Sequence, residues 1–151
     1  MLLAYRLVRL IEDRSDELAS GLVQKLQRDP NTREYLQVPP EDFRTAVYGI
    51  YHNLGEWLMG KTEADIKNRY VAIGAKRAQQ GVSLSELIYA INLTKDNLLE
   101  FLKDKAVAER PAEAFGELEV LFLLGQFFDR ATYYAAVGYE QAREARAAVY
   151  A

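Results

Sequence analysis

The chain has 151 residues, half of them hydrophobic, which is enough for one folded domain with a substantial core. Its formal net charge is -3, and lysine and arginine are scattered among aspartate and glutamate, which argues against nucleic acid or an anionic membrane as a partner. The absence of cysteine excludes disulfides, thiolate chemistry and cysteine zinc sites, and it is typical of a cytoplasmic protein. The N-terminus does not resemble a signal peptide, and the apolar run 120–124 is too short to span a bilayer.

Apolar residues recur with a helical period through the first part of the chain. They predict a first helix that bends near Arg14 and ends at Asp29, where proline follows. A loop then leads to Pro40, which with the two acidic residues after it makes a favourable first turn. This second helix is expected to end at Gly60.

Two capping boxes mark the next two helices. Thr62 with Asp65 opens a third helix, which ends at Gly81. Ser83 with Glu86 opens a fourth. Strict alternation never persists and no hairpin turn sequence occurs, so we expect no strand and an all-α fold.

Pro111 begins a last helix that is unusually apolar. From Val120 to Phe128 nearly every side of it is apolar, so it must be buried on all sides. It is either a central core helix or part of a homodimer interface in which two chains pair their last two helices. The interface residues expected in the second case are Leu98, Phe101, Leu121, Leu124, Phe128 and Tyr133.

The end of the chain has high helix propensity and no stop signal. We expect residues 1–138 to form the domain and residues 139–151 to be a C-terminal helix that leads to an output module. A natural terminus that frays is the alternative.

Chemical signals are few. His52 is the only histidine, which rules out a multi-histidine metal site and makes a Ser-His-Asp triad hard to argue. Tyr70, Ile73 and Arg77 share one helical face, and Arg77 on a pocket wall could hold a carboxylate or phosphate; a surface salt bridge is the alternative. Trp57 and His52 complete the candidate ligand-binding set. We expect no enzyme activity, no metal and no cofactor.

Three segments carry a resemblance to a known family: 54–58 (Leu-Gly-Glu-Trp-Leu), 70–87 with its Ile-Gly-x-x-Arg element, and 127–139. Over roughly residues 3–145 the chain resembles the N-terminal sensor domain of the RsbR/RsbRD type. Globin-type sensors carry a similar element, Ile-Gly-x-x-His, whose histidine holds the haem iron. Arg77 stands at that position, and a guanidinium has no lone pair to give to iron.

The resemblance implies a non-haem, globin-like bundle of about five to six helices with a long C-terminal helix. It also implies a dimeric bacterial signal-input domain of the stressosome type that transmits a stimulus, either an unknown small ligand or a partner protein, through that helix. Two alternatives stay open: a haem or tetrapyrrole sensor that uses His52, and a ligand-free scaffold for a signalling complex.

Overall fold

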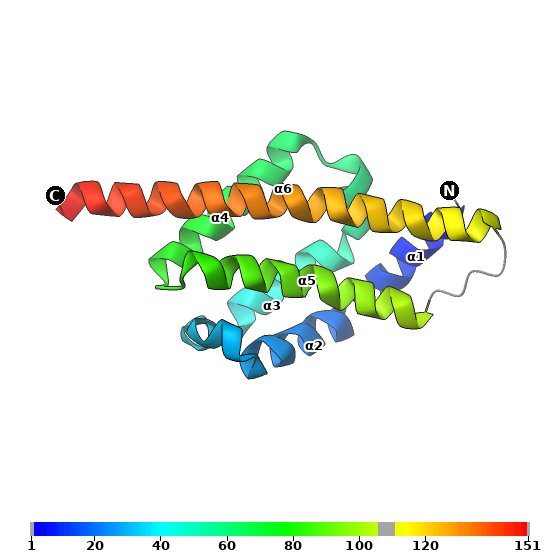
Figure 1. The fold of residues 1–151 in the computed structure, drawn as a ribbon, viewed down its shortest axis with the longest axis horizontal. Coiled ribbons are helices and arrows are strands. Elements are labelled where there is room, and N and C mark those ends of the chain that lie inside the picture. The colour runs from blue at the N-terminus through cyan, green and yellow to red at the C-terminus, as the bar shows by residue number, and fades with distance from the viewer. Residues whose placement is uncertain (1, 106–110, 151) are drawn as a thin grey trace.

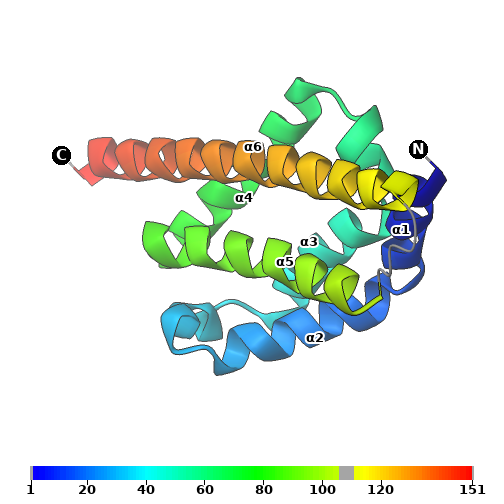
Figure 2. The same ribbon diagram turned by 45° about the vertical axis from the view of Figure 1, so that its right-hand side comes forward.

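The computed structural model describes residues 2–105 and 111–150, and every regular element in these ranges is helical. The expectation of an all-α bundle with a long last helix is therefore confirmed. Figure 1 shows α6 running across the whole molecule, and α5 runs in the opposite direction in both views (Figures 1 and 2). The elements in chain order are α1 (Leu2–Asp13), α2 (Ser15–Arg28), η1 (Pro30–Gln37), α3 (Pro40–His52), η2 (Glu56–Gly60), α4 (Glu63–Gln79), α5 (Leu84–Lys105) and α6 (Pro111–Tyr150).

The bend expected in the first helix is a complete break. α1 ends at Asp13 and α2 begins at Ser15, so Arg14 alone separates them. Both helices place one apolar face on the core, where Ile11 and Leu22 are fully buried. Two helices at an angle can each follow the core surface, which one straight helix of this length could not.

The expected loop after α2 contains the 3₁₀ helix η1. The Asp29 carboxylate caps it by accepting from the backbone N–H of Asn31 at 2.8 Å, and Pro30 occupies its first turn. Thr32 is buried, and its hydroxyl donates to the Leu26 carbonyl at 2.6 Å. Local side-chain bonds of this kind hold a short helical turn that has too few residues for a periodic apolar pattern.

The sequence predicts an unbroken second helix from Pro40 to Gly60, but the structure divides it. α3 ends at His52, and the last turn, η2, is a π-helix. Leu54, just before this turn, and Trp57, within it, are both buried. The prediction was right about the end at Gly60 and wrong about the continuity of the helix.

The two predicted capping boxes differ. At Thr62 the box is complete: its hydroxyl accepts from the Asp65 N–H at 3.2 Å, and the Asp65 carboxylate accepts from the Thr62 N–H at 2.9 Å. At Ser83 only the first half forms, with the hydroxyl accepting from the Glu86 N–H at 3.4 Å. The Glu86 carboxylate accepts instead from the Glu34 N–H at 3.0 Å, which fastens η1 to the start of α5.

α4 and α6 cross in direct backbone contact. A Cβ atom at Gly74 would overlap the carbonyl oxygen of Ala135, and a Cβ atom at Gly138 would overlap the carbonyl oxygen of Val71. Only glycine fits at both positions. Gly74 belongs to the Ile-Gly element, so the close approach of these helices is the physical reason for the glycine in that element.

α4 ends in a Schellman motif at Gly81, which has a φ of 80° and so occupies the left-handed region. The Val82 N–H donates to the Arg77 carbonyl at 3.1 Å, and the Gly81 N–H donates to the Ala78 carbonyl at 3.2 Å. Val82 is fully buried. The turn between α4 and α5 is therefore hydrogen-bonded directly to the backbone of Arg77, whose side chain is buried.

Candidate functional site

A small cavity of about 40 Å³ lies among α3, α4 and α5, with η1 and α6 contributing the remaining walls. The three side chains predicted to share a pocket face, Tyr70, Ile73 and Arg77, all line it. Its least buried side is formed by Ala46 and Ile73. The other lining residues are Tyr35, Phe43, Val47, Ile50, Leu87, Ala90, Ile91, Thr94 and Phe128.

Arg77 is the charged group of this cavity. Its side chain is on the last full turn of α4, and the residue is only 3 % exposed. The guanidinium Nη1 donates to the Gln80 amide oxygen at 2.9 Å, and its Cζ lies 5.7 Å from the centroid of the Tyr35 ring. Among the described residues Arg77 takes part in no ion pair within 4.0 Å. The surface salt bridge considered as an alternative is therefore not formed.

Asp42 is linked to Arg77 through hydrogen bonds that pass by way of Gln80. It accepts from the Gln80 amide nitrogen at 3.4 Å and pairs with the Lys76 ammonium at 3.2 Å. Asp42 thus reaches Arg77 only through a neutral amide, and a lysine already neutralises it. The partners of the buried guanidinium itself are uncharged.

Two tyrosines bring neutral hydroxyl groups to the cavity. Burial raises the pKa of Tyr35 to about 12, an effect that the charge and hydrogen bond of Arg77 oppose. Burial also raises the pKa of Tyr70, against the weaker effect of Arg69. The Tyr70 hydroxyl forms no hydrogen bond to any of the described residues, although the side chain is buried. Both phenols therefore stay protonated at neutral pH, and the Tyr70 O–H is a donor without an acceptor among the described residues.

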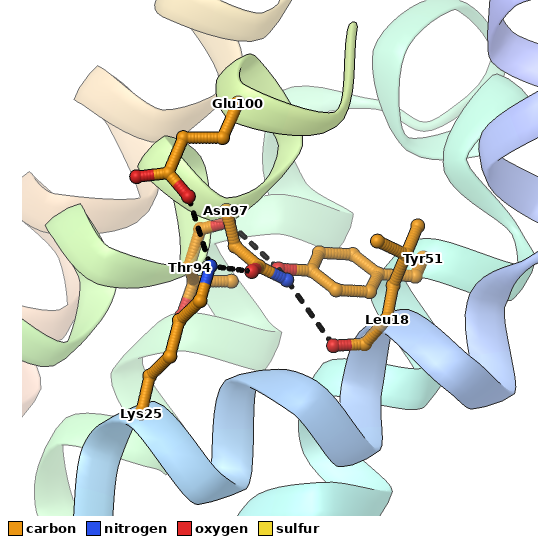
Figure 3. A network of polar contacts seen from close by, with 6 residues as sticks. All are labelled: Leu18, Lys25, Tyr51, Thr94, Asn97 and Glu100. Carbon is orange, nitrogen blue, oxygen red and sulfur yellow. Dashed lines mark hydrogen bonds and ion pairs between the residues drawn. The ribbon is translucent and has the colours of Figure 1, made fainter. Parts of the chain in front are cut away.

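A polar network lies around Thr94, one of the residues that line the cavity (Figure 3). The Tyr51 hydroxyl donates to the Thr94 carbonyl at 2.7 Å, and the Asn97 amide nitrogen donates to the Leu18 carbonyl at 3.1 Å. The Lys25 ammonium, which reaches in from α2, donates to the Asn97 amide oxygen at 2.7 Å and also to Glu100 on the surface. The network joins α2, α3 and α5, so it holds this wall of the cavity in place.

His52 and Trp57 do not line the cavity. His52 is exposed, its Nδ1 lies 3.3 Å from the Ser15 hydroxyl, and its ring stacks on Tyr48 at 5.1 Å. Trp57 packs on Phe127, with the two ring centroids 6.0 Å apart. Their membership of a ligand site stays a prediction that this conformation does not favour.

Haem does not fit this arrangement. A cavity of about 40 Å³ is far below the roughly 300–1,000 Å³ typical of pockets for larger organic ligands. The residue at the haem-ligand position is Arg77, and His52 lies outside. Within the described part of the chain no group of three or more histidine, cysteine, aspartate or glutamate side chains could hold a metal ion.

The residues predicted for a dimer interface fall into two groups. Leu98, Leu124 and Phe128 are buried in the core of a single chain, and Phe101 is half-buried. Only Leu121 and Tyr133 are exposed. The helix at 120–128 is thus buried on one side only, because the domain covers just that side.

Three large apolar side chains that the sequence analysis did not select share the exposed side of α6: Phe115, Leu118 and Phe122. Their spacing of three and four residues was the available signal. With Leu121 they make an apolar stripe along the first half of α6, which we call the α6 stripe. At the other end of α6 an open groove of about 780 Å³ separates its last turns from the end of α4, lined largely by alanine and arginine.

The fold and the cavity together define a class: an all-α domain built on one long helix, with a small, mostly apolar cavity that contains a buried cation. A family model, described as the RsbT co-antagonist protein rsbRD N-terminal domain, matches residues 16–150. The chain therefore belongs to this family of signalling input domains. Neither the curated proteins nor the solved structures gave a match. No helix in the described ranges carries an apolar stretch long enough to cross a membrane.

Proposed function

We propose that this chain is a cytoplasmic signal-input domain that pairs with a second copy through α6 and passes a stimulus along that helix to an output module. The family assignment supports a role in signalling. The α6 stripe is the observation that carries the pairing, because contiguous exposed apolar side chains commonly mark a contact surface.

The stripe has the chemistry of a helix-pairing surface. Phe122 is 65 % exposed, and Leu118 and Phe115 lie on the same side of the helix, one and two turns earlier respectively. A Cβ atom added at Gly125, one turn further on, would meet no atom of another helix within 4 Å, so that side of α6 is uncovered there as well. Two such helices side by side would bury each other's large apolar side chains.

Three contacts support transmission between the cavity and α6. Phe128 lines the cavity from α6, while the backbone of α6 crosses α4 at Gly138. Further along, the Tyr139 hydroxyl donates to the Val82 carbonyl at 2.7 Å, within the turn that the Arg77 carbonyl also anchors. These three contacts are the points at which we propose that a change at the cavity acts on α6.

The pairing is tested by light scattering after gel filtration at micromolar and higher concentrations. We expect a dimer for the natural sequence and a monomer for Phe122→Glu, because burying an unpaired carboxylate in an apolar contact is unfavourable. Leu36→Glu is the matched control: Leu36 is also 65 % exposed but lies on η1, away from α6. A monomeric natural chain, or a Leu36→Glu variant that dissociates as readily as Phe122→Glu, would overturn the proposal.

A further inference from the structure

We propose that the cavity at Arg77 binds a short aliphatic monocarboxylate of about four or five heavy atoms, such as acetate or propionate, with its carboxylate on the guanidinium and its hydrocarbon end among the apolar walls. This inference rests on the proposed input function and names the chemical class of its stimulus.

Arg77 has a buried charge that forms no ion pair with the described residues. A guanidinium on a residue only 3 % exposed has lost most of its hydration, and here its partners are the neutral Gln80 amide and the Tyr35 ring and hydroxyl. Buried charges in proteins are normally paired with an opposite charge. A carboxylate is the complementary partner, because its two oxygens match the fork of N–H donors on arginine.

The Tyr70 hydroxyl is a second polar group that a ligand in the cavity could satisfy. Tyr70 lies two helical turns before Arg77 on the same face of α4, and both side chains line the cavity. Its phenolic O–H has no acceptor among the described residues. A carboxylate on Arg77 would supply this acceptor, since an ionised carboxylate accepts at both oxygens.

The volume of the cavity and its single cation limit the size and the charge of a ligand. One water needs roughly 10–15 Å³ of such cavity volume, so about 40 Å³ accommodates a ligand equivalent to about three waters. One cation among apolar walls favours a monoanion over a dianion such as phosphate, because the second charge would be buried without a partner. The hydrocarbon end would contact Val47, Ile50 and Ile91.

The test is a titration of the 151-residue chain with sodium propionate, followed by two-dimensional ¹H–¹⁵N NMR at constant ionic strength. We expect saturable shifts at the Arg77 side chain and at the amides of Gly81 and Val82. Sodium chloride and propionamide are the controls, since one lacks the carboxylate and the other lacks the charge. Sodium phosphate tests a dianion at the same site.

Arg77→Gln should weaken propionate binding by at least about 10-fold, because it removes a charge-assisted hydrogen bond. Tyr70→Phe keeps the ring and should weaken binding by roughly 2- to 10-fold, which tests the site even if the first variant folds poorly. Arg146→Gln, at an exposed arginine near the end of α6, should bind as the natural chain does.

The inference is overturned if propionate produces no saturable shift, if chloride or propionamide shifts the same amides equally, if phosphate binds more tightly than propionate, or if Tyr70→Phe binds unchanged. The same titration on Phe122→Glu separates the two proposals. A natural chain that is monomeric yet binds propionate would refute pairing alone, and a dimer that does not bind it would refute the ligand alone.

Discussion

The hydroxyl of Tyr139 on α6 donates a 2.7 Å hydrogen bond to the carbonyl of Val82, the buried residue at the turn between α4 and α5. This contact joins residues 57 positions apart in the sequence. It ties the long helix to the turn after α4, where the Val82 N–H donates in turn to the Arg77 carbonyl.

Removal of that hydroxyl should loosen the connection without emptying the core. For Tyr139→Phe we expect a loss of about 1–2 kcal/mol in the free energy of unfolding, because the buried Val82 carbonyl loses its side-chain donor. Hydrogen exchange should be faster at residues 80–84. Tyr133→Phe is the control: Tyr133 is 64 % exposed on the same helix and should change neither measurement.

The crossing of α4 and α6 should tolerate no side chain. Gly74→Ala and Gly138→Ala each place a Cβ on a backbone carbonyl of the other helix, so we expect each to destabilise the fold by about 3 kcal/mol or more in urea unfolding. Gly125→Ala on the open side of α6 should instead stabilise it by up to about 1 kcal/mol through helix propensity. Equal effects at Gly125 and Gly138 would contradict the close contact.

The stability that the polar network around Thr94 provides should depend on the side-chain amide of Asn97. Asn97→Ala removes the acceptor of Lys25 and a donor to the Leu18 carbonyl, and we expect a loss of about 2–3 kcal/mol in the free energy of unfolding. Asn92 is on the same helix but exposed, and Asn92→Ala should be nearly neutral. A neutral Asn97→Ala variant would mean that the network adds no stability.

The capping box at the start of α4 predicts a dependence on acid. Hydrogen bonds from Thr62 lower the pKa of the exposed Asp65 below its ordinary value of 3.8. Because the folded-state pKa is the lower one, the contribution of Asp65 is present above the unfolded value and is lost as pH falls through the folded value. Thermal unfolding between about pH 5 and pH 2 should show this loss, and Asp65→Asn should reduce it. An unchanged pH profile in Asp65→Asn would contradict the assignment.

The Thr62 hydroxyl can be removed separately. Thr62→Ala should destabilise the protein by about 1 kcal/mol at neutral pH, the usual effect of losing an N-cap. Ser83→Ala, where only half of the box forms, should have a smaller effect, because Glu86 keeps its bond to the Glu34 N–H. Chemical denaturation of both variants compares the two caps. An equal loss in the free energy of unfolding would show that the bond from the Thr62 N–H to the Asp65 carboxylate adds nothing to the first cap.

Local signals predicted most of the helices. The cap at Thr62, the stop at Gly81 and the proline at Pro40 act within a few residues, so they can be read without the rest of the chain. The same locality explains why Tyr70, Ile73 and Arg77 were placed correctly on one face of a helix. The break at η2 was missed because its π turn depends on packing rather than on a residue preference.

The sequence by itself determined the helical class, the caps and the presence of an arginine on an apolar helical face, since each follows from neighbouring residues. Only the tertiary structure decided which side of α6 is covered, why Gly74 and Gly138 are glycine, and that Arg77 is buried without an acidic partner among the described residues. Those outcomes depend on contacts between segments far apart in the chain, and such contacts leave no periodic pattern in a single sequence.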